Sequence, residues 1–267
     1  MILNDILKTV ESKYPLSLQY NWDNSGLNIG DEDQEVKKIM LTLEVTEKTV
    51  DEAIEKNVDL IISHHPFLFS KINKVNKKDI KGKLIYKLIS NSISVYCMHT
   101  SYDLAFDGLN DYFMKLIDAK IEGILDVEGR LDSYLEGRNY GLGRTGRLNQ
   151  AMKIEDFINH LKEKLKIQHL RYVGQDNIEI STIAVVTGAG AEFFQKAKDI
   201  RIDLLVTGDM KYHQAMDAME INMPVVDCGH YGSEHIFADS LIDFLESNLS
   251  EVDVIKSENI VNPFKEM

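Results

Sequence analysis

Cysteine, proline and tryptophan are scarce in this chain of 267 residues, which contains two, four and one of them respectively. The two cysteines, Cys97 and Cys228, are too few for a disulfide framework, which argues against a small secreted scaffold. No apolar run approaches the ~20 residues that a membrane-spanning helix needs. The first residues also lack the basic stretch and apolar core of a signal peptide. We therefore expect a reduced, cytoplasmic protein without a membrane partner.

Positive charge is also in deficit. Lys and Arg number 30 against 43 Asp and Glu, which gives a formal net charge of −13. Non-specific binding of nucleic acid needs a basic face that neutralises phosphates, so nucleic acid is not an expected partner. The same acidic balance suits cations as ligands.

The remaining composition is that of an ordinary globular protein, with 44% hydrophobic and 27% charged residues. The length allows one large or two ordinary domains. Short apolar runs alternate with segments of helical period, and this alternation predicts an α/β fold. The expected strands are 38–43, 58–63, 93–97, 181–187, 202–207, 224–228 and 252–256.

Two adjacent histidines, His64 and His65, follow the expected strand 58–63. Function in open α/β sheets sits at the carboxyl ends of strands. Neighbouring side chains on a strand point to opposite faces, so the two histidines can share a site only if the chain has left the strand. Pro66 supports this, because proline donates no ladder hydrogen bond and restricts the residue before it. For the dipeptide alone, the alternative is a pair of ordinary surface histidines.

The second half of the chain repeats the pattern of the first. Segment 202–207 matches segment 58–63 at an offset of 144 residues, and the lysine-rich stretch 71–83 has the length and place of an insertion in the first copy. We predict two similar α/β domains from an internal duplication, 1–125 and 126–267, in which 126–180 is a connecting segment with glycine-rich loops. The alternative is that any two βαβ units share such strands.

Each copy also places a histidine four residues before a carboxylate, His99 before Asp103 and His230 before Glu234. Residues four apart share a face where a helix begins. Imidazole and carboxylate together suit Zn, Mn or Fe. Six of the eight histidines lie in these loops or at the adjoining helix starts: His64, His65, His99, His213, His230 and His235. The pattern predicts a metal site.

Glycines give weaker signals. Residues 141–146 match G-x-G-x-x-G, but a dinucleotide fingerprint needs a strand before it and a helix after it, and the sequence predicts neither. Arg144 and Arg147 remain candidate anion contacts. Gly188 and Gly190, before an expected helix at 191–198, are a candidate phosphate cradle, with a plain strand-to-helix turn as the alternative. The stretch 22–27 has turn chemistry, and Trp22 is expected to fill the core beside it.

Six ordered segments resemble one known family, the NIF-three-like proteins, which are also called GTP cyclohydrolase I type 2 homologues. The resemblance covers nearly the whole chain. The segments are Trp22–Leu27, Ser63–Pro66, His99–Asp103, Gly141–Arg144, Gly208–His213 and Gly229–Glu234. Departures are small: Ser101 and Tyr102 stand where the family has Asn-Leu, and Cys228 stands where it has Ala.

The resemblance implies a centre of two divalent metal ions per chain (Zn, Fe or Mn), placed between two similar α/β domains. It also implies a ring-shaped homohexamer. Carried over position by position, it implies the metal ligands His64, His65, Asp103, His230 and Glu234. It implies that His99 and His213 lie nearby, either as groups that support the ligands or as groups that transfer protons.

The function that we expect is a metal-dependent hydrolase acting on a nucleotide or another phosphate-bearing small molecule. Two ions about 3.5–4 Å apart can generate a hydroxide and clamp an oxyanion. Asp103 or Glu234 would bridge the ions, His213 or His99 would act on protons, and Gly188, Gly190 and Arg144 would contact the substrate. The alternative is a non-catalytic metal-binding scaffold or interaction protein, for which the coordination shell would be closed.

Overall fold

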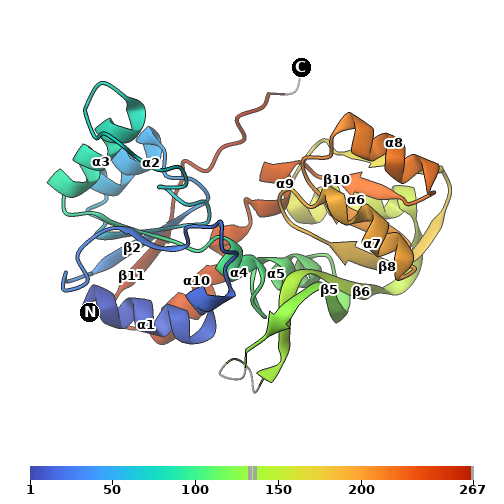
Figure 1. Ribbon diagram of the computed structural model, residues 1–267, viewed down its shortest axis with the longest axis horizontal. Coiled ribbons are helices and arrows are strands. Elements are labelled where there is room, and N and C mark those ends of the chain that lie inside the picture. Colours follow the sequence, from blue (N-terminus) through green and yellow to red (C-terminus); the bar gives the residue numbers. More distant parts are fainter. Residues whose placement is uncertain (132–133, 135–136, 266–267) are drawn as a thin grey trace. The chain divides into compact units, whose positions relative to one another are not determined.

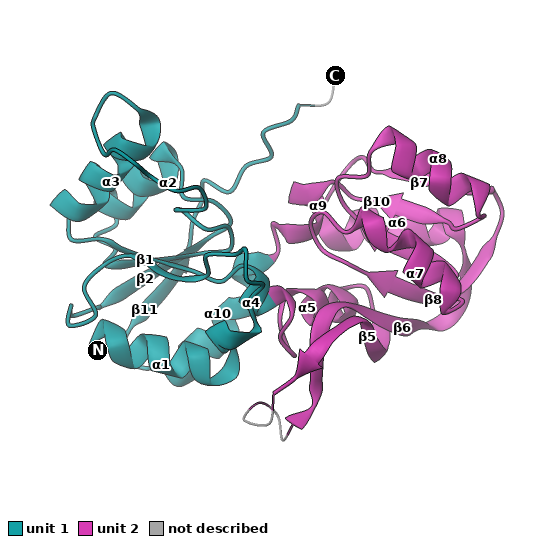
Figure 2. Cartoon of the chain, in the orientation of Figure 1, with its two compact units in different colours: residues 1–102, 237–267 teal, residues 103–236 magenta. Residues whose placement is uncertain are grey.

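The structure, a computed structural model, describes residues 1–131, 134 and 137–265, which form two compact units (Figures 1 and 2). Unit 1 comprises Met1–Tyr102 and Phe237–Met267, and unit 2 comprises Asp103–Ile236. Each unit is built on its own mixed sheet, and both sheets carry helices. The predicted α/β class is therefore confirmed. None of the helices among these described residues is long and apolar enough to span a bilayer.

Unit 1 contains a five-stranded sheet in the order β1-β4-β3-β2-β11. Its strands are β1 (Gly26–Ile29), β2 (Lys38–Thr42), β3 (Leu60–Ser63), β4 (Ser94–Cys97) and β11 (Asp253–Lys256). All neighbours are parallel except β1, which runs antiparallel to β4. Four of these strands are therefore in one direction, and β2, β3 and β4 present their carboxyl ends at one edge of the sheet.

Helices cover both faces of this sheet (Figure 1). They are α1 (Leu3–Lys13), the 3₁₀ turn η1 (Leu16–Leu18), α2 (Glu47–Glu55), α3 (Ile80–Ser90) and α10 (Phe237–Asn248). Met40, Ile61 and Val95 project from successive strands into the core under α2 and α3. Thr46 caps α2 as expected, because its side chain accepts from the Thr49 amide. The short helix α4 (Thr100–Asp103) follows β4 and contains the boundary between the units.

Unit 2 contains a six-stranded sheet in the order β5-β6-β8-β9-β10-β7. Its strands are β5 (Ala119–Arg130), β6 (Asn139–Lys153), β7 (Arg171–Val173), β8 (Glu179–Val185), β9 (Leu204–Thr207) and β10 (Val225–Asp227). Its helices are α5 (Leu109–Leu116), α6 (Ile154–Leu165), the 3₁₀ turn η3 (Ala191–Phe193), α7 (Phe194–Asp199), α8 (Tyr212–Glu220) and α9 (His230–Glu234). Ala184, Leu205 and Val225 pack with α7 and α8 in a common core.

The glycine-rich part of the expected connecting segment 126–180 is not made of loops. It contains the long antiparallel strands β5 and β6. Gly141 and Gly146 lie in β6, where an added Cβ atom would stand 1.9 Å from the Asp126 carbonyl and 2.3 Å from the Lys120 carbonyl. Glycine is needed here because the partner strand approaches too closely for a side chain. The G-x-G-x-x-G match is thus part of a strand, which agrees with its rejection as a dinucleotide motif.

The compact units also differ from the expected division at residues 125 and 126. That point lies inside β5, whereas the chain leaves unit 1 after Tyr102 and returns to it at Phe237. The physical reason is strand pairing, because β11 adds to the free side of β2 and draws α10 with it. Unit 1 is therefore discontinuous in sequence.

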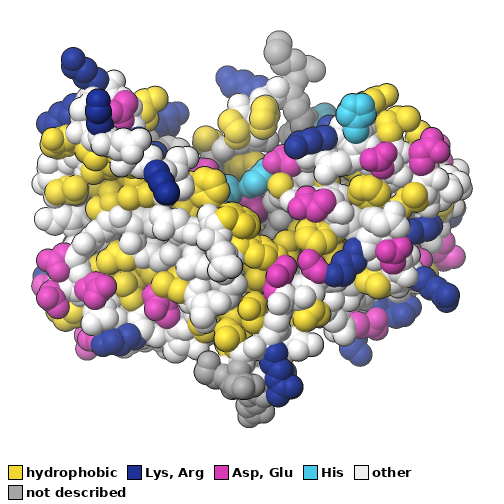
Figure 3. All heavy atoms as spheres, in the orientation of Figure 1, with side chains coloured by type: hydrophobic (Ala, Val, Ile, Leu, Met, Phe, Trp, Pro, Cys, Tyr) yellow, Lys and Arg dark blue, Asp and Glu magenta, His cyan; other side chains and the backbone are white. Residues whose placement is uncertain are grey.

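The two sheets share a core of four strands, beyond which unit 1 adds the parallel strand β11 and unit 2 adds the antiparallel strand β6. Read from one edge, β1-β4-β3-β2 in unit 1 corresponds to β7-β10-β9-β8 in unit 2, with three parallel strands and an antiparallel edge strand in each. β3 and β9 take the same place, as the offset of 144 residues requires. The segment before α3 is longer than the one before α8 and consists of exposed, lysine-rich coil. Figure 3 shows Lys and Arg side chains gathered at this end of unit 1.

Candidate metal centre

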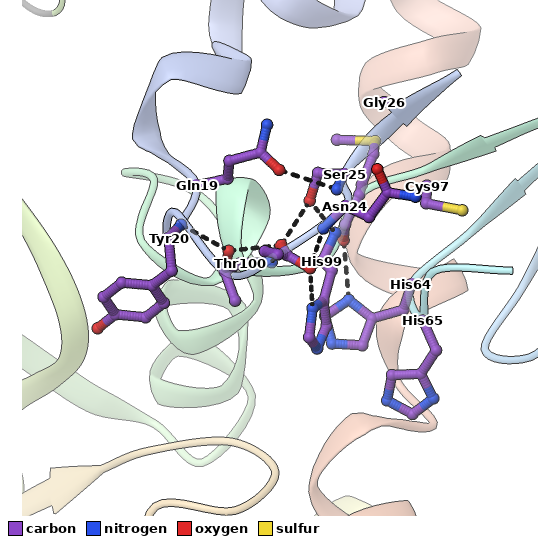
Figure 4. Close-up of polar contacts among 12 residues, drawn as sticks. Gln19, Tyr20, Asn24, Ser25, Gly26, His64, His65, Cys97, His99 and Thr100 are labelled. Atoms are coloured by element: carbon purple, nitrogen blue, oxygen red, sulfur yellow. Dashed lines mark hydrogen bonds and ion pairs between the residues drawn. The ribbon is translucent and has the colours of Figure 1, made fainter. Parts of the chain in front are cut away.

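Three histidines of unit 1 lie together at the carboxyl ends of two neighbouring strands. His64 and His65 follow β3, His99 follows β4, and Ser63 pairs with Cys97 at the ends of these parallel strands. The three imidazoles each place a nitrogen within 4.8 Å of the others. Figure 4 shows the three rings side by side. The chain has left the strand at His64, so adjacent residues can share one site.

Each of these rings is fixed through its Nδ1 atom by an oxygen that can only accept a hydrogen bond. The acceptors are the Met98 carbonyl for His64 (2.9 Å), Glu44 Oε1 for His65 (2.7 Å) and Asp23 Oδ1 for His99 (2.8 Å). Nδ1 must therefore carry a proton, and in the neutral ring the lone pair is on Nε2. This is the arrangement in which proteins present histidine to a metal ion.

Asp23 organises the loop around His99. Its buried carboxylate also accepts from the Thr100 amide (3.0 Å), the Thr100 hydroxyl (2.6 Å) and the Ser25 hydroxyl (2.8 Å). Burial alone would raise the pKa of Asp23, but the hydrogen bond and charge of His99, with the Thr100 hydroxyl, hold that pKa well below its usual range. Asp23 is thus a carboxylate at neutral pH and orients the His99 ring.

Glu44 has the same relation to His65. Burial acts to raise the pKa of Glu44, but the hydrogen bond and charge of His65 lower it below its usual value. The side chain is ionised at neutral pH and orients the His65 ring. Neither Glu44 nor Asp23 was singled out from the sequence, because an acceptor for a ligand histidine has no characteristic spacing from it.

Unit 2 repeats this arrangement after β10, in the short helix α9. His230 Nε2 lies 2.9 Å from Glu234 Oε2, so the predicted pair of imidazole and carboxylate is in contact. His230 Nδ1 lies 2.8 Å from Asp209 Oδ2, which makes Asp209 a third acceptor that sequence reasoning missed. Glu234 is buried, and an added Cβ atom at Gly188 would stand 2.2 Å from its Oε1. Gly188 therefore makes room for this carboxylate.

Asp103 and His213, the other predicted site residues, differ in burial. Asp103 is the last residue of α4 and is buried, and its carbonyl accepts from the Asn110 side chain at 3.1 Å. His213 is exposed in the first turn of α8, where its ring lies 5.3 Å from that of Tyr212. Within the described part of the chain, the clusters of potential metal donors include neither Asp103 nor His213.

The predicted substrate contacts have structural partners within unit 2. Arg144 is fully buried and pairs with Asp111 at 2.6 Å, and its remaining donors bind the carbonyls of Gly141, Gly143 and Ala105. Burial acts to raise the pKa of Asp111, more strongly than Arg144 lowers it. Through its ion pair with Asp111, Arg144 links β6 to α5, as a structural residue does.

The amides of Gly188 and Gly190 donate to the hydroxyls of Ser233 (2.9 Å) and Thr207 (3.0 Å). Gly188 has a positive φ of 66°. These bonds make the segment a tight strand-to-helix turn, which is the alternative to the phosphate cradle. Gly188 thus lies beside the Glu234 carboxylate, and its lack of a side chain leaves room for that carboxylate.

Trp22 does not fill the core, in contrast to the sequence-based expectation. Its side chain is 61% exposed. The Asp23 amide donates to the Tyr20 carbonyl and closes a turn that carries Trp22 outward, where its ring stacks on Tyr20. A local turn signal cannot specify which way the residue at its corner faces.

The donor set fits a divalent transition metal. Unit 1 offers three imidazoles with oriented Nε2 atoms, and unit 2 offers an imidazole in contact with a buried carboxylate. Zn, Fe and Mn all accept this mixture of nitrogen and oxygen donors. The side chains that orient the rings are carboxylates in three cases, as is usual behind metal-bound histidine.

Comparisons with known proteins identify the family of the chain. The family model of Duf34/NIF3 (NGG1p interacting factor 3) matches residues 1–263. A Clostridium acetobutylicum protein named GTP cyclohydrolase 1 type 2 homolog is 36% identical, and the match covers 98% of both chains. A Clostridium perfringens protein of the same name is 35% identical over 99% of both chains.

Solved structures match over the whole length. A Staphylococcus aureus protein superimposes with a TM-score of 0.91 at 29% identity and covers 100% of this chain and 99% of its own. A Bacillus cereus protein related to NIF3 has the same TM-score and coverage at 23% identity, which shows the shared fold. The ordered motifs, the fold and the full-length family match agree, and the chain belongs to the Duf34/NIF3 family.

Proposed function

We propose that this protein is a metal-dependent hydrolase with two divalent ions per chain, acting on a nucleotide or another phosphate-bearing small molecule. The proposed ligands are His64, His65, Asp103, His230 and Glu234. The observation that carries the proposal is the fixed Nδ1 atom of each ligand histidine, which makes Nε2 the donor atom in both units.

The ligand chemistry explains why both units contribute. The cluster in unit 1 consists of imidazoles, which are neutral ligands, whereas two divalent ions need anionic donors that bridge them. Asp103 and Glu234 supply these carboxylates and are buried. Five ligands shared by two ions also leave coordination positions for water, as in catalytic rather than structural sites. When bound, such ions would lower the pKa of a water molecule toward ~7.

His99 is the proton acceptor that the geometry favours. It lies with His64 and His65 but is not among the five proposed ligands, and the hydrogen bond from its Nδ1 to Asp23 makes Nε2 its proton-accepting atom. His213 is the second candidate, from its place in the Gly208–His213 segment. Its exposure on α8 gives it less support.

The phosphate-bearing substrate class is supported by the names of the relatives, which refer to a nucleotide, GTP. The homohexamer that the family resemblance implies is part of the same proposal. Light scattering on the purified chain would measure it, with a mass of six 30.5 kDa chains expected.

Turnover by the metal-loaded protein on a panel of nucleotides and phosphate esters tests the proposal. We expect His99→Gln to lower kcat by about 10²-fold or more, the range of general base catalysis, while the metal content stays unchanged. His160→Gln is the matched control. Nε2 of this half-buried histidine contacts the carbonyl of Ile117, the residue directly after α5. Absence of turnover on every compound, with metal bound, would instead indicate the non-catalytic scaffold.

A further inference from the structure

Three aromatic side chains of unit 1, one half-buried and two exposed, lie in contact beside the histidine cluster. We call Tyr20, Trp22 and Phe69 the aromatic platform. Trp22 stacks on Tyr20 with ring centroids 5.4 Å apart and an interplanar angle of 18°, and it meets the edge of Phe69 at 6.2 Å. Trp22 and Phe69 are 61% and 57% exposed. Burying an aromatic side chain stabilises a folded protein by a free energy of several times RT. The exposure of these neighbouring rings therefore calls for an explanation.

The platform adjoins the candidate metal centre directly. The His99 ring lies 6.1 Å from Trp22 and 6.5 Å from Phe69, edge to face in both cases. His99 itself clusters with His64 and His65. A group bound on the platform would therefore present its substituents to the histidines.

The two segments that carry the platform are held rigidly together. The Asn24 side chain donates to the Leu68 carbonyl (2.7 Å), and the Leu68 amide donates to Asn28 Oδ1 (2.8 Å). The Tyr20 amide donates to the Thr100 hydroxyl, which in turn donates to Asp23 (Figure 4). The rings are thus held in place before any ligand arrives, which lowers the entropic cost of binding.

We propose that the aromatic platform binds the planar heteroaromatic ring of the substrate, such as a nucleobase, and so selects ring-bearing phosphates over sugar phosphates at the histidine cluster. Flat rings stack on exposed Trp, Tyr and Phe whatever their hydrogen-bonding edges, so the platform sets the class of ring and not its identity. This inference rests on the proposed function only for the reaction that follows binding, because a ring can stack on the platform without a metal ion.

The single tryptophan makes the binding step directly measurable. Intrinsic fluorescence of the full chain reports on Trp22, with guanosine 5′-monophosphate, adenosine 5′-monophosphate and ribose 5-phosphate as probes. We expect both nucleotides to quench the emission saturably and to bind about tenfold or more tightly than ribose 5-phosphate, in metal-loaded and metal-free protein. Equal affinity for nucleotides and ribose 5-phosphate would overturn the proposal.

Variants measured by calorimetry separate stacking from other causes. Trp22→Leu should weaken guanosine 5′-monophosphate binding about tenfold, Trp22→Phe should retain most of it, and Phe69→Leu should weaken it to a smaller degree. Phe264→Leu is the control, because Phe264 is also exposed, at 78%, but lies near the C-terminus. The proposal fails if Trp22→Leu and Phe69→Leu both bind like the control, or if Trp22→Leu changes only the oligomeric mass.

The metal content of the same variants keeps this result apart from the proposed function. If the protein binds no metal but still prefers nucleotides, the hydrolase proposal fails and the platform stands. If it binds metal and turns over phosphate esters without preference for a ring, the platform proposal fails alone.

Discussion

At the scale of single residues, the site depends on the groups behind the histidines as much as on the histidines themselves. The sequence indicated His64, His65, His99 and His230, because each follows a predicted strand. It did not indicate the acceptors, since Asp23 is 76 residues from His99 and Glu44 is 21 residues from His65. Only the fold brings these pairs together, so no local pattern could predict them.

Asp23→Asn tests the importance of one acceptor. The amide keeps the size of the side chain but loses the charge, and its NH₂ group cannot accept from His99 or Thr100. We expect a loss of about 1–3 kcal/mol in the free energy of unfolding, measured by urea denaturation at neutral pH, and a change in the NMR signals of the His99 ring. Asn24→Asp is unsuitable as a control because Asn24 ties two loops, so exposed Asp33→Asn serves instead. A variant as stable as wild type, with an unchanged His99, would contradict this role.

At the scale of elements, the regular strands and helices were largely predictable, whereas the glycine-rich hairpin was not. Apolar runs and caps marked β2, β3, β4, β8, β9, β10 and the helices between them. β5 and β6 were missed because glycine has a low propensity for strands. Gly141 and Gly146 are needed because the backbone of the partner strand lies too close for a side chain. This requirement for glycine arises from the pairing of β5 with β6, and the sequence of either strand alone does not show it.

The return of the chain to unit 1 also depends on a contact distant in sequence. Glu52 in α2 accepts from the Ser257 hydroxyl (2.6 Å), the Glu258 amide (2.9 Å) and the Asn259 side chain (2.9 Å), just after β11. Burial acts to raise the pKa of Glu52, but these bonds and Lys56 lower it to about 2. The carboxylate therefore holds the C-terminal segment against α2.

We expect Glu52→Gln to lower the free energy of unfolding by about 1–3 kcal/mol at pH 7. Because the folded pKa is depressed, the carboxylate's contribution is full above its ordinary value of 4.5 and disappears as the pH falls toward about 2. Denaturation of wild type and variant between pH 7 and 2 measures this, with exposed Glu55→Gln on the same helix as the control. A difference that stays constant down to pH 2 would show that the carboxylate charge is not involved.

At the scale of the whole molecule, the two units share a core of four strands, and each has histidine after the carboxyl ends of its parallel strands. The correspondence of β1-β4-β3-β2 with β7-β10-β9-β8 supports the internal duplication that we propose from the offset of 144 residues. A duplicated unit explains why His99 and His230 each follow the third parallel strand of their sheets.

The metal content of the purified chain tests this account most directly. We expect two divalent ions per chain in the wild type by elemental analysis, and loss of at least one in each of Asp103→Ala, Glu234→Ala and His65→Ala. Glu220→Ala and His160→Ala, which replace residues outside the proposed ligand set, should keep both ions. Retention of two ions per chain in both carboxylate variants would contradict the central claim that Asp103 and Glu234 are ligands of a dinuclear centre.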